Sequence, residues 1–133
     1  TATVNGVASN ALDLSSINGI FSQNTYTDNH ANNGNYSIND LNIGTKNFIS
    51  LTGTAFNQQF TITGITGGVA GKTIIIYNSG SGNMIVNNLN SASAAANQIS
   101  TLNGGNINTN QAGNMTFVYD GVSSKWIVTG IQQ

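Results

Sequence analysis

Residues 60–86 read FTITGITGGVAGKTIIIYNSGSGNMIV, and this stretch decides the fold class. In its first run, FTIT, apolar residues alternate with threonine, which is the pattern of a strand with one buried face. The second run, TIIIYN, has three consecutive isoleucines, so we expect a strand that is covered on both faces. Glycines fill the segments between the runs and indicate turns. The stretch therefore predicts short β-strands joined by tight turns.

The same pattern of short apolar runs continues on both sides of this stretch. Strands are predicted over residues 17–22, 36–43, 47–52, 59–65, 73–78, 84–86, 106–108, 115–120 and 125–131. The segments SGSGN (79–83) and DGVSSK (120–125) are predicted hairpin loops, because glycine and aspartate favour such turns. The alanine-rich segment 91–99 predicts a short helical turn or a loop. No internal repeat of fixed period is evident.

Many short strands with glycine turns predict an all-β fold, and we expect an antiparallel β-sandwich of the jelly-roll type. The β-sandwich domain is predicted over residues 35–133. Residues 1–34 are less regular and are expected to form an N-terminal arm or additional strands. The chain has no proline and only three lysines to protect its edge strands. We therefore expect some edges to be buried between copies of the chain.

The low charge of the chain excludes several classes of partner. Charged residues make up 5% of the 133 residues, whereas the average protein has about 25%. Three scattered lysines cannot neutralise a run of phosphates or anchor a basic membrane helix, so neither nucleic acid nor a membrane is an expected partner. The absence of cysteine excludes disulfides and thiolate metal sites. When two copies of the chain associate, a surface of amides and hydroxyls loses less hydration free energy than a charged surface does.

No group of residues in the sequence predicts catalysis. His30 lies in the polar segment TDNHANNGN (27–35) with Asp28 nearby, but no nucleophile accompanies the pair. The same segment resembles a calcium loop only in part, because the glutamate that completes an EF-hand is missing. The glycines of GITGGVAG (64–71) precede a predicted strand, whereas a phosphate-binding loop precedes a helix. We therefore expect no enzyme activity, no metal and no cofactor.

The single tryptophan and the four tyrosines could stack against sugars. Trp126 and Tyr119 lie in predicted strands, and we expect both in the core. The other candidates flank the polar segment 27–35 and are better placed for contact with a ligand. A receptor-contact surface is therefore predicted from Tyr26, Asn29, His30, Asn32, Asn33 and Tyr36.

The order of motifs from residue 41 to residue 131 points to a family. The motifs are ITGI (62–65), glycines in GGVAG (67–71), an apolar strand ending in YNSG (77–80), the short strand MIV (84–86), an Ala/Ser/Asn-rich segment (91–99) and YDG (119–121) followed by Trp126. In this order they resemble a module of bacteriophage tail fibres, spikes and related virion fibre proteins. Lys72 and Lys125 agree with cationic positions of that module, whereas residues 1–34 do not match it.

The resemblance implies a β-structured homotrimer and a non-enzymatic virion structural protein. We expect a fibre or spike domain at the virion surface that attaches to a glycan or protein receptor on the host surface. Other virion proteins are further expected partners. There are three alternative functions. The first is a capsid decoration or head-fibre protein, the second is a bacterial surface adhesin domain, and the third is a polysaccharide-depolymerising enzyme. Three copies would bind a repeated ligand with greater avidity than one copy.

Overall fold

The computed structural model describes residues 3–4, 7–8, 23–27, 36–52 and 59–133. In these ranges the chain is all-β, as the apolar runs predict. The elements are β1 (Thr3–Val4), β2 (Val7–Ala8), β3 (Gln23–Thr27), β4 (Tyr36–Ile38), β5 (Phe48–Thr52), β6 (Gln59–Ile62), β7 (Thr73–Asn78), β8 (Asn83–Val86), the 3-10 helix η1 (Ala95–Asn97), β9 (Ile99–Ser100), β10 (Ile107–Asn108), β11 (Gly113–Asp120) and β12 (Lys125–Gln132).

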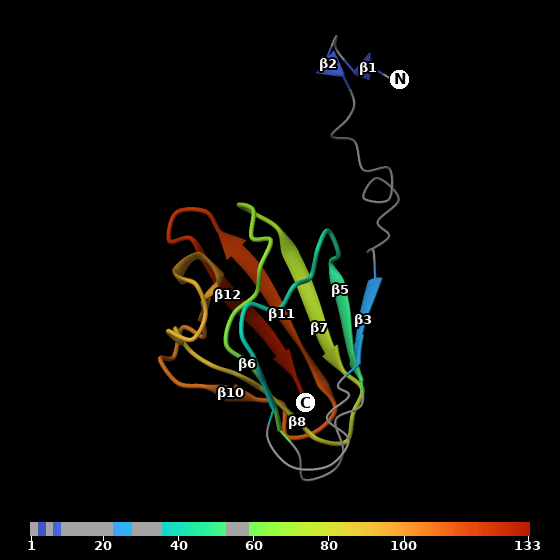
Figure 1. Ribbon diagram of the computed structural model, residues 1–133, viewed down its shortest axis with the longest axis vertical. Helices are drawn as coiled ribbons and strands as arrows, with labels where there is room; N and C mark the ends of the chain where they lie inside the picture. The colour runs from blue at the N-terminus through green and yellow to red at the C-terminus, as the bar shows by residue number, and fades with distance from the viewer. Residues whose placement is uncertain (1–2, 5–6, 9–22, 28–35, 53–58) are drawn as a thin grey trace.

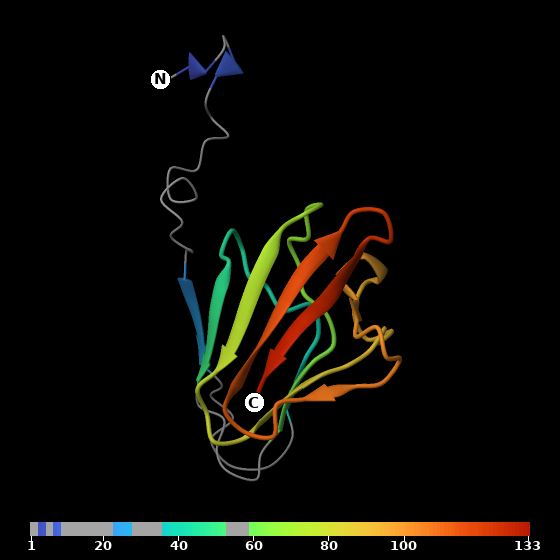
Figure 2. The same cartoon turned by 180° about the vertical axis from the view of Figure 1, so that it is seen from behind.

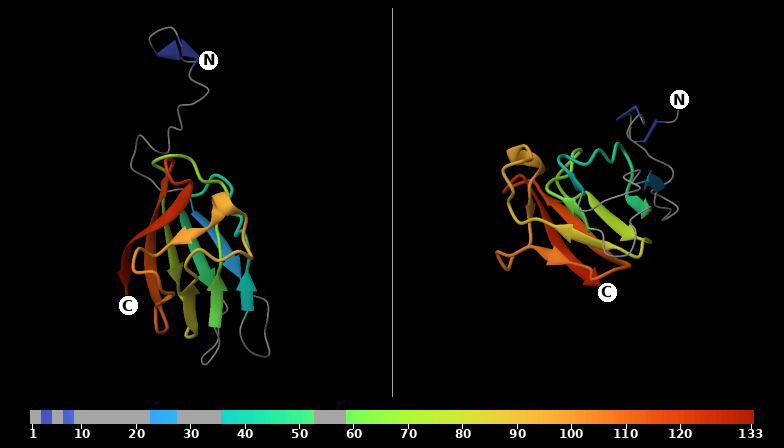
Figure 3. Two further views of the ribbon diagram at one scale, coloured as in Figure 1. Left: turned by 90° about the vertical axis from the view of Figure 1, so that its left-hand side faces the viewer. Right: turned by 60° about the horizontal axis from the view of Figure 1, so that its bottom comes forward.

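Two sheets make up the body of the fold. The six-stranded sheet has the order β3-β5-β7-β11-β12-β9, and the four-stranded sheet has the order β10-β8-β6-β4. Figure 1 shows β6, β8 and β10 in front of the larger sheet, and Figure 2 shows β3, β5, β7, β11 and β12 side by side from behind. The two sheets face one another as two layers (Figure 3). β1 and β2 form a further two-stranded antiparallel sheet.

From β3 to β10 the chain passes alternately through the two main sheets. β3, β5, β7 and β9 belong to the six-stranded sheet, and β4, β6, β8 and β10 belong to the four-stranded sheet. β3, β5 and β7 pair in parallel, and so do β4, β6 and β8. The result is a β-solenoid of about 4 turns. The antiparallel hairpin of β11 and β12 extends the six-stranded sheet beside β7.

The predicted antiparallel jelly-roll sandwich is therefore wrong, because both main sheets contain parallel and antiparallel pairs. The segment SGSGN (79–83) closes no hairpin but carries the chain from β7 in one sheet to β8 in the other. The buried amide of Asn78 fixes this corner. Its Nδ2 donates to the carbonyl oxygens of Gly82 (2.8 Å) and Gln111 (3.0 Å), and its Oδ1 accepts from the backbone N–H of Gly80 (3.0 Å).

Equivalent side chains stack between successive turns of the solenoid, although the sequence shows no evident repeat. In the four-stranded sheet the neighbours in register are Tyr36, Phe60 and Met84 at one position and Ile38, Ile62 and Val86 at the next inward position. The members from β6 and β8 are fully buried. The repeat is hard to recognise in the sequence because the three equivalent segments, YSI (36–38), FTI (60–62) and MIV (84–86), are all largely hydrophobic but share hardly any residue types.

The strand TIIIYN is not covered on both faces, contrary to the prediction. Ile74 and Ile76 point into the core, whereas Ile75 is half-buried and Tyr77 is 39% exposed. The four-stranded sheet packs against only one face of the larger sheet, so β7 keeps an outer face. Strand alternation places Ile75 and Tyr77 there.

Trp126 and Tyr119 belong to the core, as the sequence predicts. Their rings meet edge to face, with centroids 5.2 Å apart and planes inclined by 72°. Trp126 also donates its Nε1–H to the carbonyl oxygen of Ile65 at 2.8 Å, so its polar group is satisfied inside the protein. This bond ties β12 to the corner that follows β6.

The remaining predicted elements differ from the structure mainly in length. β4 and β6 are shorter than predicted, and Leu41 and Ile65 beyond them form an isolated parallel bridge. The alanine-rich segment 91–99 contains only the single turn η1. The loop DGVSSK (120–125) closes the hairpin of β11 and β12, as predicted. The strand predicted over residues 17–22 lies outside the described residues. β3, within the predicted N-terminal part, pairs with β5 in the six-stranded sheet.

A close contact at Gly64 fixes the loop that precedes β9. A Cβ atom on Gly64 would lie 2.5 Å from both Cβ and Oγ of Ser93 and 2.8 Å from the carbonyl oxygen of Asn97. Ser93 Oγ is also 2.7 Å from Oγ1 of Thr63, and both of these side chains are buried. A side chain at position 64 would therefore collide with Ser93 and with the backbone of Asn97.

We expect Gly64→Ala to lower the free energy of unfolding by about 1–3 kcal/mol, because overpacking forces neighbouring groups apart. Urea denaturation followed by tryptophan fluorescence measures this change, since Trp126 is fully buried. Gly105→Ala is the matched control, because its Cβ would meet only Asn103 Oδ1 at 3.8 Å. Equal stability of the two variants would contradict the packing described at Gly64.

Candidate functional site

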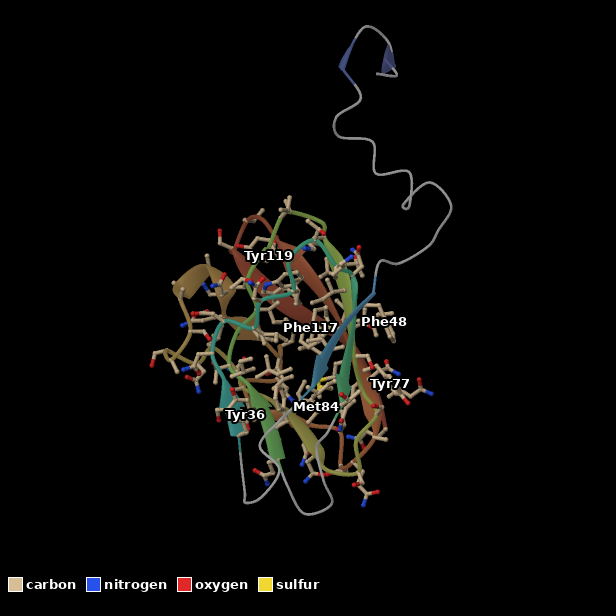
Figure 4. All side chains as sticks on the ribbon, turned by 45° about the vertical axis from the view of Figure 1, so that its right-hand side comes forward. Tyr36, Phe48, Tyr77, Met84, Phe117 and Tyr119 are labelled. Carbon is tan, nitrogen blue, oxygen red and sulfur yellow. The ribbon has the colours of Figure 1, made fainter. Side chains whose placement is uncertain are left out.

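A shallow groove lies on the outer face of the six-stranded sheet, the face turned away from the four-stranded sheet. It is lined by Phe48, Ile75, Tyr77 and Asn114 and has a volume of about 310 Å³. Figure 4 shows Phe48 and Tyr77 on the outside of the body, whereas Phe117 lies between the sheets. The groove is therefore open to solvent and separate from the hydrophobic core.

Strand alternation and register assemble the lining of this groove. Alternate residues of β5 and β7 face the core, which leaves Phe48, Ile75 and Tyr77 on the outer face. Phe48 is directly opposite Ile75, and Tyr77 is opposite Ser50 on one side and Asn114 on the other. The rings of Phe48 and Tyr77 are stacked, with centroids 6.3 Å apart and planes inclined by 28°. Part of each ring remains accessible to a ligand.

Amide side chains border the aromatic pair. Asn114 Nδ2 donates to Oε1 of Gln132 at 3.0 Å across the β11–β12 pair. A carboxamide has two N–H donors and an oxygen with two lone pairs, so this amide pair retains capacity for further hydrogen bonds. Ser50 and Thr116 occupy neighbouring outward positions and add hydroxyl groups. The groove thus has an apolar floor and a neutral polar rim.

The outer face of the four-stranded sheet has a different character. In its strands β4, β6, β8 and β10, the outward residues are Ser37, Gln59, Thr61, Asn83, Ile85 and Asn108. Only one of these side chains is apolar, and none is aromatic. Exposed aromatic rings on a sheet face are therefore a property of the larger sheet, which singles it out as the candidate contact surface.

Two lysines hold loops in place through backbone carbonyls. Lys72 Nζ donates to the carbonyl oxygens of Gly44 and Gly67, both at 3.2 Å. Lys125 Nζ donates to the carbonyl oxygen of Ala95 at 2.6 Å and so connects β12 to η1. Partial burial lowers the pKa of Lys72 below its usual value of 10.5, because desolvation disfavours the ammonium form.

Asp40 has a comparable structural role. Its Oδ1 accepts hydrogen bonds from the backbone N–H of Ala94 (3.1 Å) and from Nδ2 of Asn97 (2.9 Å), which fastens η1 to the corner after β4. Within the described ranges, no three His, Cys, Asp or Glu side chains gather in a way that could hold a metal ion.

Asp120 organises the loop between β11 and β12. Its carboxylate accepts from the backbone N–H of Val122 (3.1 Å) and from both the N–H (3.0 Å) and the hydroxyl (2.6 Å) of Ser123. The bonds from Ser123, followed by the bond from Val122, hold the pKa of Asp120 below its usual value of 3.8. The side chain acts on its own loop and is partly exposed to solvent.

The structure places the predicted receptor-contact residues as follows. Tyr26 belongs to β3 and pairs in register with Leu51 of β5. Tyr36 begins β4, where its half-buried ring packs on Phe60 with centroids 5.6 Å apart and planes inclined by 51°. Tyr36 does not line the groove. Outside the described residues lie Asn29, His30, Asn32 and Asn33.

The sequence matches no protein-family model and no curated protein. Across the described part of the chain, no helix has the length and the hydrophobicity needed to cross a membrane. The choice of the groove as the candidate site therefore depends on its own geometry and chemistry.

Sequence reasoning identified none of the four residues that line the groove as site residues. A usable signal is present in FISLT (48–52), where the face that carries Ser50 and Thr52 also carries Phe48. An aromatic residue on the polar face of a half-buried strand lies outside the core, so it is a candidate for part of a contact surface when further apolar residues lie beside it. Ile75 is hidden by the run of three isoleucines, which conceals the alternation of β7.

We expect NMR titration of the Asp120 carboxyl group to give a pKa below 3.8. Because the folded-state pKa is depressed, ionised Asp120 stabilises the fold above the unfolded-state pKa, and this contribution is lost as the pH falls through the folded-state pKa. Ser123→Ala removes the hydroxyl donor, so the pKa should rise toward its ordinary value and the acid-dependent part of the stability should shrink. Ser91→Ala, in an exposed loop, is the control. A wild-type pKa at or above 3.8 would contradict the arrangement.

Proposed function

We propose that the chain is a non-enzymatic structural module of a virion fibre or spike that acts in attachment to the host surface. The module is a rigid support for exposed contact surfaces. Its copies associate as a homotrimer, so that several sites engage a repeated ligand together. The observation that carries this proposal is the exposed, uncharged aromatic groove on the outer face of a β-solenoid.

The solenoid body supports this role. Successive turns are joined by parallel backbone pairing and by stacked side chains, so each turn rests mainly on its neighbours. A body of this kind holds its loops and sheet faces at fixed positions, which favours binding to a ligand that is itself fixed to a surface. The resemblance of residues 41–131 to virion fibre modules points in the same direction.

Four charged side chains in the described part of the chain favour binding over catalysis. Lys72, Lys125, Asp40 and Asp120 all bind loop groups. General acid–base catalysis requires an ionisable group within hydrogen-bond reach of the reacting atoms. The four residues that line the groove are uncharged at neutral pH.

Sedimentation equilibrium should reveal a species of three 13.8 kDa chains as the protein concentration increases. The low charge leaves little repulsion between copies, so we expect the association to change little between low and high salt. A species of one chain at every concentration would contradict the fibre or spike proposal.

Attachment and depolymerisation predict different results with bacterial cells and their surface polysaccharide. We expect the labelled chain to sediment with cells of a susceptible species while the content of reducing sugar stays constant. Release of reducing ends would instead indicate a depolymerising enzyme, and Asp40→Asn and Asp120→Asn would then test which carboxylate is required. Heat-denatured chain is the control for nonspecific adsorption.

A further inference from the structure

We infer that the groove formed by Phe48, Ile75, Tyr77 and Asn114 binds a neutral saccharide. The inference rests on the attachment function proposed above and names the ligand class of its contact surface. The groove has a volume of about 310 Å³, which is at the lower end of the range of about 300–1,000 Å³ for small-molecule sites. It therefore suits a ligand of about one or two sugar residues.

The aromatic floor supplies the first element of sugar recognition. The rings of Phe48 and Tyr77 are stacked at 28° with centroids 6.3 Å apart, so they form an inclined apolar step beside Ile75. Aromatic faces carry the negative part of the ring quadrupole. The C–H bonds on the flat side of a pyranose ring are weakly positive and lie favourably on such faces. Tyr77 is 39% exposed and is the more accessible of the contacts.

The amide rim supplies the second element. Asn114 and Gln132 are bonded to one another at 3.0 Å, which fixes both amide groups at the border of the floor. A sugar carries hydroxyl groups around its edge that donate and accept, and carboxamides also do both. A ligand that lies with its flat side on the rings would thus present its edge to this pair. The amide groups would therefore orient the sugar, and the aromatic rings would supply most of the contact area.

The absence of charge in the lining selects a neutral ligand. None of the four lining residues is charged at neutral pH. The hairpin residues Asp120 and Lys125 are paired at one end of β11 and β12, and Asn114 and Gln132 are paired at the other end. An anionic sugar in the groove would lose hydration without gaining a cationic partner. The same argument disfavours a nucleotide, whose phosphate would need lysine or arginine.

A second copy of the chain fits the groove less well than a saccharide. A stable protein interface buries about 800 Å² on each partner. Among the described residues, the apolar part of the groove consists of three side chains on two neighbouring strands, and polar residues border it at Ser50 and Asn114. A small concave site with two rings and a polar rim matches a small ligand instead.

The test is an NMR titration of the ¹⁵N-labelled full chain with cellotetraose, maltotetraose, tetra-N-acetylchitotetraose and a linear galactotetraose. At least one probe should shift the side-chain amide signals of Asn114 and Gln132. Phe48→Ala and Tyr77→Ala should each weaken that binding about tenfold or more, because each removes a ring face. Tyr77→Phe keeps the ring and should keep most of the affinity.

Val122→Ala is the matched control, since Val122 is 97% exposed in the β11–β12 loop and does not line the groove. Thermal melting confirms that each variant is folded. The inference is overturned if none of the four probes binds, or if the two alanine variants bind as well as the wild type. It is also overturned if either alanine variant dissociates the oligomer, because a second copy would then occupy the groove.

The outcomes separate the two proposals. A trimer that binds none of the probes overturns the saccharide site and leaves the fibre or spike proposal standing. A single-chain species that binds a probe through Phe48 and Tyr77 supports the saccharide site and overturns the trimeric fibre.

Discussion

The parallel register between successive turns is the constraint on which the rest of the structure depends. Because Tyr36, Phe60 and Met84 are neighbours in the four-stranded sheet, inward side chains of one turn rest on inward side chains of the next. A slip of one residue would exchange the inner and outer faces of a strand. Register therefore determines at once which side chains form the core and which are available to a ligand on the outside.

The corners between the strands explain why the chain is rich in amides and hydroxyls and poor in charge. Each corner leaves backbone groups that a sheet cannot pair, and buried groups of this kind require partners. Asn88 Oδ1 accepts from both the N–H (3.0 Å) and the hydroxyl (3.1 Å) of Thr101, and the amide of Asn78 holds the corner after β7. Neutral side chains satisfy such groups at a lower desolvation cost than charged ones. The few charged groups described above anchor loops at the surface.

The sequence predicts the strands better than their partners. Alternation locates the strands and identifies Trp126 as a core residue, and the loop 120–125 predicts a hairpin that the structure confirms. The jelly-roll topology is wrong because a glycine-rich loop looks the same whether it closes a hairpin or turns a corner between sheets. What distinguishes the corner at 79–83 is a contact between Asn78 and Gln111, which are far apart in the sequence. The groove is hidden for the same reason, since three strands assemble it through long-range pairing.

The separation of inner and outer faces has a consequence for the function of the module. The inward residues of β5 and β7, such as Ile49 and Ile76, pack the core, whereas Phe48 and Tyr77 on the same strands lie outside it. Outer residues can therefore change while the register of the solenoid is kept. A contact surface built in this way can alter its ligand without a change of fold. The core does not require large aromatic side chains at these two outer positions. The presence of Phe48 and Tyr77 there is therefore better explained by contact with a ligand than by packing.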